Sequence, residues 1–123
     1  MTEQTEQLLP TTPVFIRTPQ PITQVEENRP LRISATAIGN PKPVFSWIIN
    51  NRVLLPSNNV LMVGNVDEET LIINRVTKEF RGVLTVVAAN SAGEARAAAE
   101  IEVCDFWVQK LFRVRSFRSF KKL

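Results

Sequence analysis

The residue types that usually carry catalysis are scarce in this chain. It contains no histidine, which removes the commonest general base and the commonest protein metal ligand. The single cysteine, Cys104, therefore has no histidine to activate it, and one thiol cannot build a zinc site. We interpret Cys104 as an ordinary residue at the end of a strand. The sequence predicts no catalytic residue, no cofactor and no enzyme activity.

Asp67, Glu68 and Glu69 form the longest acidic run. Carboxylates can bind calcium, but a dedicated calcium loop places its oxygen ligands at alternating positions. Three consecutive acids do not have that spacing, so we expect a solvated turn and predict no metal site. The stretch 39–43 is not a phosphate-binding loop, because it carries two prolines and no second glycine.

Charge is distributed unevenly over the 123 residues, although the formal net charge is only +3. Residues 1–104 carry 9 Lys/Arg and 11 Asp/Glu, whereas residues 105–123 carry 6 Lys/Arg and one acid. The high isoelectric point is therefore a property of the last segment. A mildly acidic body argues against a nucleic-acid-binding face on that body.

The basic segment 105–123 interleaves its charges with large apolar residues. Wound as a helix, it would bring Trp107, Leu111, Val114 and Phe117 near one face. Such a segment suits an anionic membrane surface or a calmodulin-like groove. The interpretation that we favour is a segment without a binding role: a linker, a chain end specific to one splice form, or the end of a truncated gene product. Weak nucleic-acid contact ranks last. The candidate partner-binding residues here are Trp107, Leu111, Phe112, Arg113, Arg115 and Phe117.

Several absences favour an intracellular protein. One cysteine allows no intrachain disulfide, and no Asn-x-Ser/Thr sequon occurs. The polar start 1–7 has neither the basic region nor the apolar region of a signal peptide. No apolar run approaches the roughly twenty residues that a membrane span needs. We therefore expect a cytoplasmic location.

Short alternating segments dominate the chain between residues 13 and 104. Leu31, Ile33 and Ala35 alternate with polar residues, which is typical of a strand with one buried face. Turn residues separate such segments at roughly ten-residue spacing, which predicts an all-β sandwich of two antiparallel sheets with Greek-key connections. A helix is the alternative only for the alanine-rich stretch 95–99. The expected strands are 14–16, 22–25, 31–38, 44–49, 53–55, 60–63, 70–76, 83–89 and 95–103.

Two motifs lie within this series of expected strands and turns: Gly-Asn-Pro-Lys-Pro-Val-Phe-Ser-Trp at 39–47 and Asn-Ser-Ala-Gly at 90–93. Together with Thr-Leu-Ile-Ile at 70–73, they make the chain from about 13 to 103 resemble an immunoglobulin domain of the I-set. The intracellular domains of titin, twitchin and obscurin are the most similar in style. The resemblance implies an immunoglobulin-like Greek-key sandwich.

The resemblance also assigns a core. Ala35 and Val86 stand where the pattern has its two disulfide cysteines, and Trp47 is the tryptophan that packs against them. Leu84 replaces the tyrosine of the tyrosine corner, and the chain has no tyrosine at all. We therefore expect Ala35, Trp47, Leu84 and Val86 in a core without a disulfide.

Phe80 replaces an acidic corner residue of the pattern and precedes Arg81. An exposed aromatic beside an arginine would suit a protein interface, so both are candidate partner-binding residues. The alternative, which we favour, is that Phe80 fills the space left by the missing tyrosine.

We expect three parts: a disordered lead 1–12, an I-set domain 13–104 and a basic aromatic tail 105–123. The resemblance implies a non-enzymatic module for protein contact or spacing in a cytoskeletal or sarcomeric assembly, with cytoskeletal proteins or neighbouring immunoglobulin domains as partners. The alternatives are an extracellular adhesion domain without its leader, and an adaptor that works through membrane or calmodulin contact of the tail. Fold alone does not decide among them.

Overall fold

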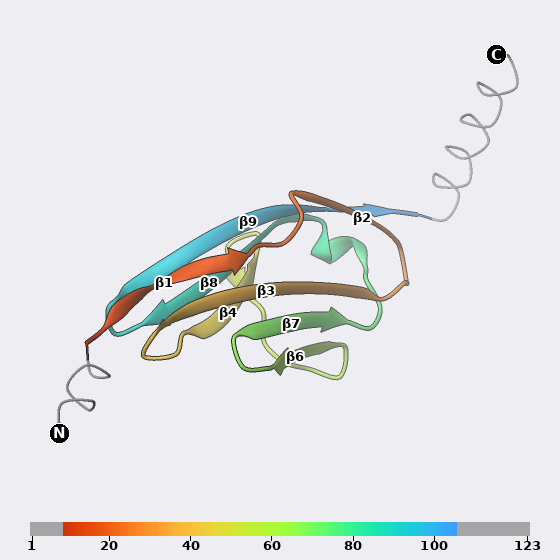
Figure 1. Cartoon of the computed structure of the whole chain (residues 1–123). Helices are drawn as coiled ribbons and strands as arrows, with labels where there is room; N and C mark the ends of the chain where they lie inside the picture. Colours follow the sequence, from red (N-terminus) through yellow and green to blue (C-terminus); the bar gives the residue numbers. More distant parts are fainter. Residues whose placement is uncertain (1–8, 106–123) are drawn as a thin grey trace, which may run out of the picture.

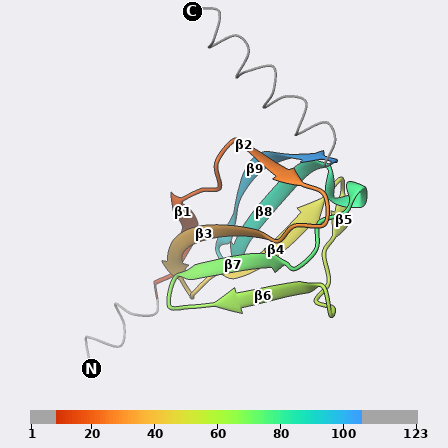
Figure 2. The ribbon, with the colours of Figure 1, turned by 90° about the vertical axis from the view of Figure 1, so that its right-hand side faces the viewer.

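The computed structural model describes residues 9–105, which form two β-sheets packed face to face (Figure 1, Figure 2). One sheet has the strand order β1-β3-β7-β6 and the other the order β2-β9-β8-β4-β5. A short 3-10 helix, η1 (Lys78–Phe80), precedes β8. The strands are β1 (Thr11–Arg17), β2 (Ile22–Glu26), β3 (Leu31–Asn40), β4 (Val44–Ile49), β5 (Arg52–Val53), β6 (Val60–Gly64), β7 (Glu68–Ile73), β8 (Gly82–Asn90) and β9 (Gly93–Cys104).

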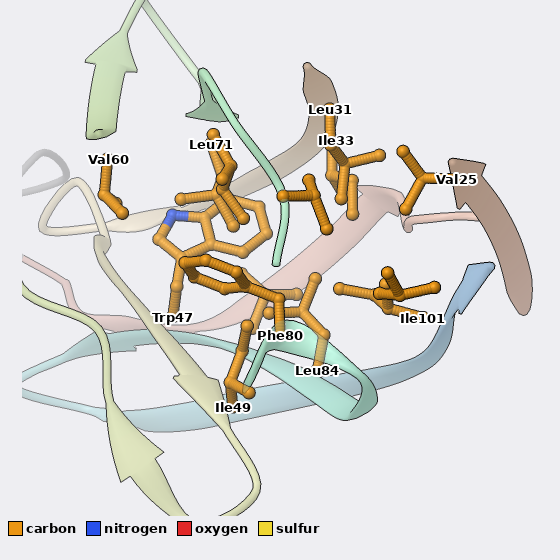
Figure 3. Packing of buried hydrophobic residues seen from close by; sticks show 14 of the residues in the cluster. Val25, Leu31, Ile33, Trp47, Ile49, Val60, Leu71, Phe80, Leu84 and Ile101 are labelled. Atoms are coloured by element: carbon orange, nitrogen blue, oxygen red, sulfur yellow. The ribbon is translucent and has the colours of Figure 1, made fainter. Parts of the chain in front are cut away.

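Alternation along the strands builds the core. In β3, Leu31 and Ile33 are buried while Arg32 between them is exposed. The antiparallel partner β7 places Ile73 and Leu71 directly opposite these two residues. Because successive side chains point to opposite faces of a sheet, each strand sends one apolar set into the space between the sheets (Figure 3). The predicted all-β sandwich is confirmed.

Most strands agree with the expected ranges to within two residues at each end, and three strands need comment. β1 begins at Thr11, inside the segment expected to be disordered, because Thr11 pairs with Asn40 of β3. β5 contains only the first residue of the expected strand 53–55, and β7 covers 68–73 instead of 70–76. The alanine-rich stretch 95–99 is strand, within β9.

One pairing departs from the antiparallel expectation, since β2 runs parallel to β9. β1 and β2 are consecutive segments separated by Thr18–Pro21, where the chain crosses from the four-stranded to the five-stranded sheet. Proline suits such edge positions because its missing N–H is not needed by a ladder there. The chain keeps its direction through the crossing, so β2 pairs with the last strand, β9, in parallel orientation.

Asn90 joins three segments at one end of the sandwich. Its Nδ2 donates to the carbonyl oxygens of Thr11 and Pro41, both at 2.8 Å. Its Oδ1 accepts from the N–H groups of Ala92 and Gly93. A Cβ at Gly39 would lie 3.0 Å from Asn90 Nδ2, which explains the glycine there. The two sequence motifs thus meet in space through one amide.

Asn50 plays a comparable part at the opposite end. Its Oδ1 accepts from the N–H of Val83 at 3.0 Å, and its Nδ2 donates to the carbonyl of Arg81 at 2.8 Å. Gly82 between them has φ +132°, and a Cβ there would collide with the Asn50 side chain. This amide therefore holds the corner whose tyrosine is absent.

Replacing Asn90 by alanine should destabilise the protein by about 2 kcal/mol, because several hydrogen bonds are lost together. Urea denaturation followed by tryptophan fluorescence measures this free energy. Asn58→Ala is the matched control, since the exposed Asn58 side chain makes no hydrogen bond within residues 9–105, and it should change stability by less than about 0.5 kcal/mol. Equal effects of the two substitutions would contradict the role given to Asn90.

Candidate interaction site

Residues 9–105 contain no group of three or more His, Cys, Asp or Glu side chains placed to hold a metal ion. No helix in this part of the chain is long and apolar enough to cross a membrane. The surface and its ends are therefore the places where this domain can meet other molecules.

The acidic run is not the solvated turn that we expected. Glu68 and Glu69 belong to β7, and Glu69 lies on the inward side, in register with Ala35 of β3. Glu69 Oε1 accepts a hydrogen bond of 2.8 Å from Trp47 Nε1, while Trp47 itself has no exposed surface. A buried indole N–H needs such an acceptor. One acid of the run thus serves the core.

The structure buries the four residues assigned to the core. Trp47, Ala35 and Val86 are fully buried and Leu84 is 1% exposed. Trp47 of β4 lies opposite Val86 of β8 within the five-stranded sheet. Figure 3 shows the Trp47 indole among aliphatic side chains that come from both sheets.

Phe80 is not the exposed anchor that one interpretation required. It ends η1 with only 6% of its surface exposed and belongs to the same apolar cluster as Trp47 and Leu84 (Figure 3). Its ring therefore fills the core instead of projecting from the surface. Arg81 beside it is exposed. The candidate residues of the tail, Trp107, Leu111, Phe112, Arg113, Arg115 and Phe117, lie outside the described residues.

A hollow of about 510 Å³ lies beside this corner. Phe80 and Ile49 contribute to its apolar lining, and Arg52 and Glu79 are its charged members. The exposed Leu55 also lines it. Arg52 and Glu79 do not form an ion pair with each other. The hollow therefore combines an apolar lining with one positive and one negative side chain.

The outer face of the four-stranded sheet carries a row of exposed aliphatic side chains. Val14 of β1 pairs with Ile38 of β3. On the other side of β3, the N–H of Ala37 donates to the carbonyl of Asp67 at 3.0 Å, and this bond brings the neighbouring Val66 close to Ile38. Val14 is 54% exposed, Ile38 46% and Val66 71%. Ile16, also exposed, lies further along β1. We name Val14, Ile16, Ile38 and Val66 the aliphatic patch. Sequence periodicity could have indicated it, since these residues alternate with inward ones.

The immunoglobulin I-set domain family matches residues 13–103 of this chain. The chain belongs to this family. It is 31% identical over 93 residues to the muscle M-line assembly protein unc-89 of Caenorhabditis elegans, covering 76% of this chain and 1% of that protein. It is also 31% identical over 83 residues to protein turtle homolog B of Rattus norvegicus, covering 68% of this chain and 6% of the relative.

Solved structures of muscle proteins also resemble this chain. The titin M10–obscurin-like 1 Ig complex contains a chain that matches with a TM-score of 0.72 and 29% identity, over 78% of this chain and 95% of that one. The twitchin kinase region of C. elegans matches with a TM-score of 0.69 and 30% identity, over 74% of this chain and 16% of that one. This I-set chain thus corresponds to a small part of the large relatives.

Replacing Glu69 by alanine should destabilise the domain by about 1–3 kcal/mol, because the buried Trp47 N–H loses its acceptor. Glu69→Gln keeps an acceptor oxygen and should restore most of that loss. The matched control is Glu68→Ala on the outward side of the same strand, with an expected change within about 0.5 kcal/mol. Urea denaturation compares the three, and equal losses for Glu68→Ala and Glu69→Ala would contradict the assignment.

Proposed function

We propose that this I-set domain is a spacer and protein-docking module of a cytoskeletal or sarcomeric assembly, and that it works in the cytoplasm. The observation that carries the proposal is the placement of the two ends of the described chain. β1 begins beside Asn40 and Asn90, at the β8–β9 hairpin. β9 ends beside Glu27, whose N–H donates to the Cys104 carbonyl at 2.7 Å. The chain therefore enters and leaves at opposite ends of the sandwich (Figure 1).

Opposite ends suit a module that is threaded in series. A pull on both ends slides β2 and β9 past each other, because these parallel strands are drawn in opposite directions along their axes. The hydrogen bonds between them lie roughly across the direction of pull. They are therefore loaded together, and sliding requires that they break together. This geometry supports a load-bearing spacer.

The chemistry of the core favours a reducing compartment. Ala35 and Val86 stand where a disulfide would be built, and both are fully buried without any sulfur. Small domains in oxidising compartments commonly use such bridges, whereas cytosolic ones cannot keep them. The extracellular adhesion alternative, to which the similarity to protein turtle homolog B gives weight, therefore ranks second.

A protein partner is supported from two sides. The solved relative in the titin M10–obscurin-like 1 Ig complex binds another protein, which makes a neighbouring immunoglobulin domain our first candidate. The aliphatic patch offers the exposed apolar area on which a protein interface can centre.

The spacer role predicts a specific weakness in β2. Two backbone hydrogen bonds join β2 to β9 at its ends, from Glu100 N–H to the Pro21 carbonyl and from Glu27 N–H to the Cys104 carbonyl. They show that the odd-numbered residues of β2 direct their backbone groups toward β9. Thr23 is therefore bonded to β9, whereas the backbone groups of Gln24 point away from it. Thr23→Pro should lower the force at which the full chain unfolds in single-molecule stretching. Gln24→Pro is the control and should retain a clearly higher force. Equal forces for both variants would contradict the load path.

The docking role predicts a dependence on the aliphatic patch. The full chain should retain cytoskeletal proteins from muscle extract under reducing conditions, and Ile38→Asp should lose them, because a charge then sits at the centre of the patch. Val44→Asp should retain them, because Val44 is exposed on the other sheet (70%, against 46% for Ile38). Equal capture by both variants would place docking elsewhere.

A further inference from the structure

The outer face of the five-stranded sheet carries acidic and apolar side chains side by side. Register places Ile22 of β2, Glu100 of β9 and Val83 of β8 in one row across three strands. Ile22 and Val83 are 54% and 52% exposed. The neighbouring row continues the apolar surface with Ala98, Thr85, Ile48 and Val53. We name these residues, with Ile22 and Val83, the shelf.

Two carboxylates on this face are not balanced by a cation of the described chain. Arg96 is held by Glu94 at 2.6 Å. The Glu102 carboxylate accepts a hydrogen bond of 2.9 Å from the neutral amide of Gln24, and the Glu100 carboxylate has no hydrogen bond or ion pair with any residue of 9–105. The shelf therefore lies beside negative charge.

The two outer faces differ in the sign of their charge. The four-stranded sheet directs Arg32 outward from β3 and Arg17 from β1, against one acid, Glu68. A positively charged apolar segment is thus attracted to the five-stranded sheet and repelled from the other one.

This chain itself carries a segment with that chemistry. Residues 106–123 contain all six Lys/Arg of the basic tail, no acid, and apolar residues that include Trp107 and Leu111. They follow Cys104 and Asp105, at the end of β9 and one row beyond Glu102. Extended, they would reach roughly 60 Å, while the strands from β9 to β5 span about 15 Å at ordinary spacing. The shelf is within reach.

We propose that residues 106–123 fold back on their own domain and cover the shelf. Their basic side chains pair with Glu100 and Glu102, and their apolar side chains bury Val83, Ala98 and Val53. The covalent link raises the effective concentration of the segment at the shelf, so contacts that are weak individually suffice. The segment then shields this face from other proteins. The contact is independent of the proposed spacer role.

Fluorescence of the full chain tests the contact directly. The chain has two tryptophans, and Trp47 is fully buried, so subtracting the Trp107→Phe variant isolates the signal of Trp107. At low salt we expect acrylamide to quench Trp107 several-fold less than it quenches N-acetyltryptophanamide. Glu100→Lys should abolish most of this protection, whereas the matched control Glu68→Lys on the other sheet should preserve it.

Methyl NMR supplies a second measurement that does not depend on Trp107. Leu111→Asp should shift the methyl signals of Val83 and Ala98, while those of Ile38 and Val66 on the opposite face stay in place. Full quenching of Trp107 in the unsubstituted chain would overturn the proposal. Protection that survives Glu100→Lys would also overturn it, because the segment would then lie elsewhere. Protection that grows with protein concentration would overturn it in favour of contact between two copies.

Discussion

The hydrogen bond between Trp47 and Glu69 is the interaction on which the interior depends. Trp47 lies in β4 of one sheet and Glu69 in β7 of the other, so the bond ties the two layers together. Ala35 and Val86 occupy the positions where two cysteines would form a disulfide between the layers. Without that disulfide the domain lacks stabilisation of about 2–5 kcal/mol. Apolar packing recovers part of that loss, but packing alone leaves an indole N–H without a partner. Glu69 removes that penalty and orients the largest buried ring.

Much of the fold could be predicted from the sequence, because period-two alternation is strong in β3 and β9. The inward position of Glu69 was not predicted, because three consecutive acids indicated a solvent-exposed turn. Glu69 is nevertheless two and four residues from Leu71 and Ile73, so its side chain lies on the same inward side of the strand. The Asn90 motif was recognisable, but not the segments that its amide joins. The prolines before β2 marked a break without showing which sheet receives the next strand. Long-range partners of this kind are set by packing, which a local pattern does not contain.

Family membership explains the interior better than the exterior. Inward side chains are constrained to apolar shapes that fill the space between two sheets, and those constraints are shared by all such sandwiches. Outward side chains are free of them. Here that freedom appears as an aliphatic patch beside Arg17 on one face and an aliphatic shelf beside Glu100 on the other. The two faces therefore differ in the charge that lies beside their apolar side chains, although the same core supports both.

The proposed spacer and docking roles would use different groups of the same strands, so one small domain could serve both. Load along β2 and β9 is resisted by backbone hydrogen bonds that lie in the plane of the sheet. Docking on either face uses side chains that stand perpendicular to that plane. The charges on each face attract a partner of opposite charge, and the apolar side chains beside them provide surface that can be buried on binding. Outer side chains such as those of Ile38 and Glu100 can therefore change without removing the backbone hydrogen bonds between strands.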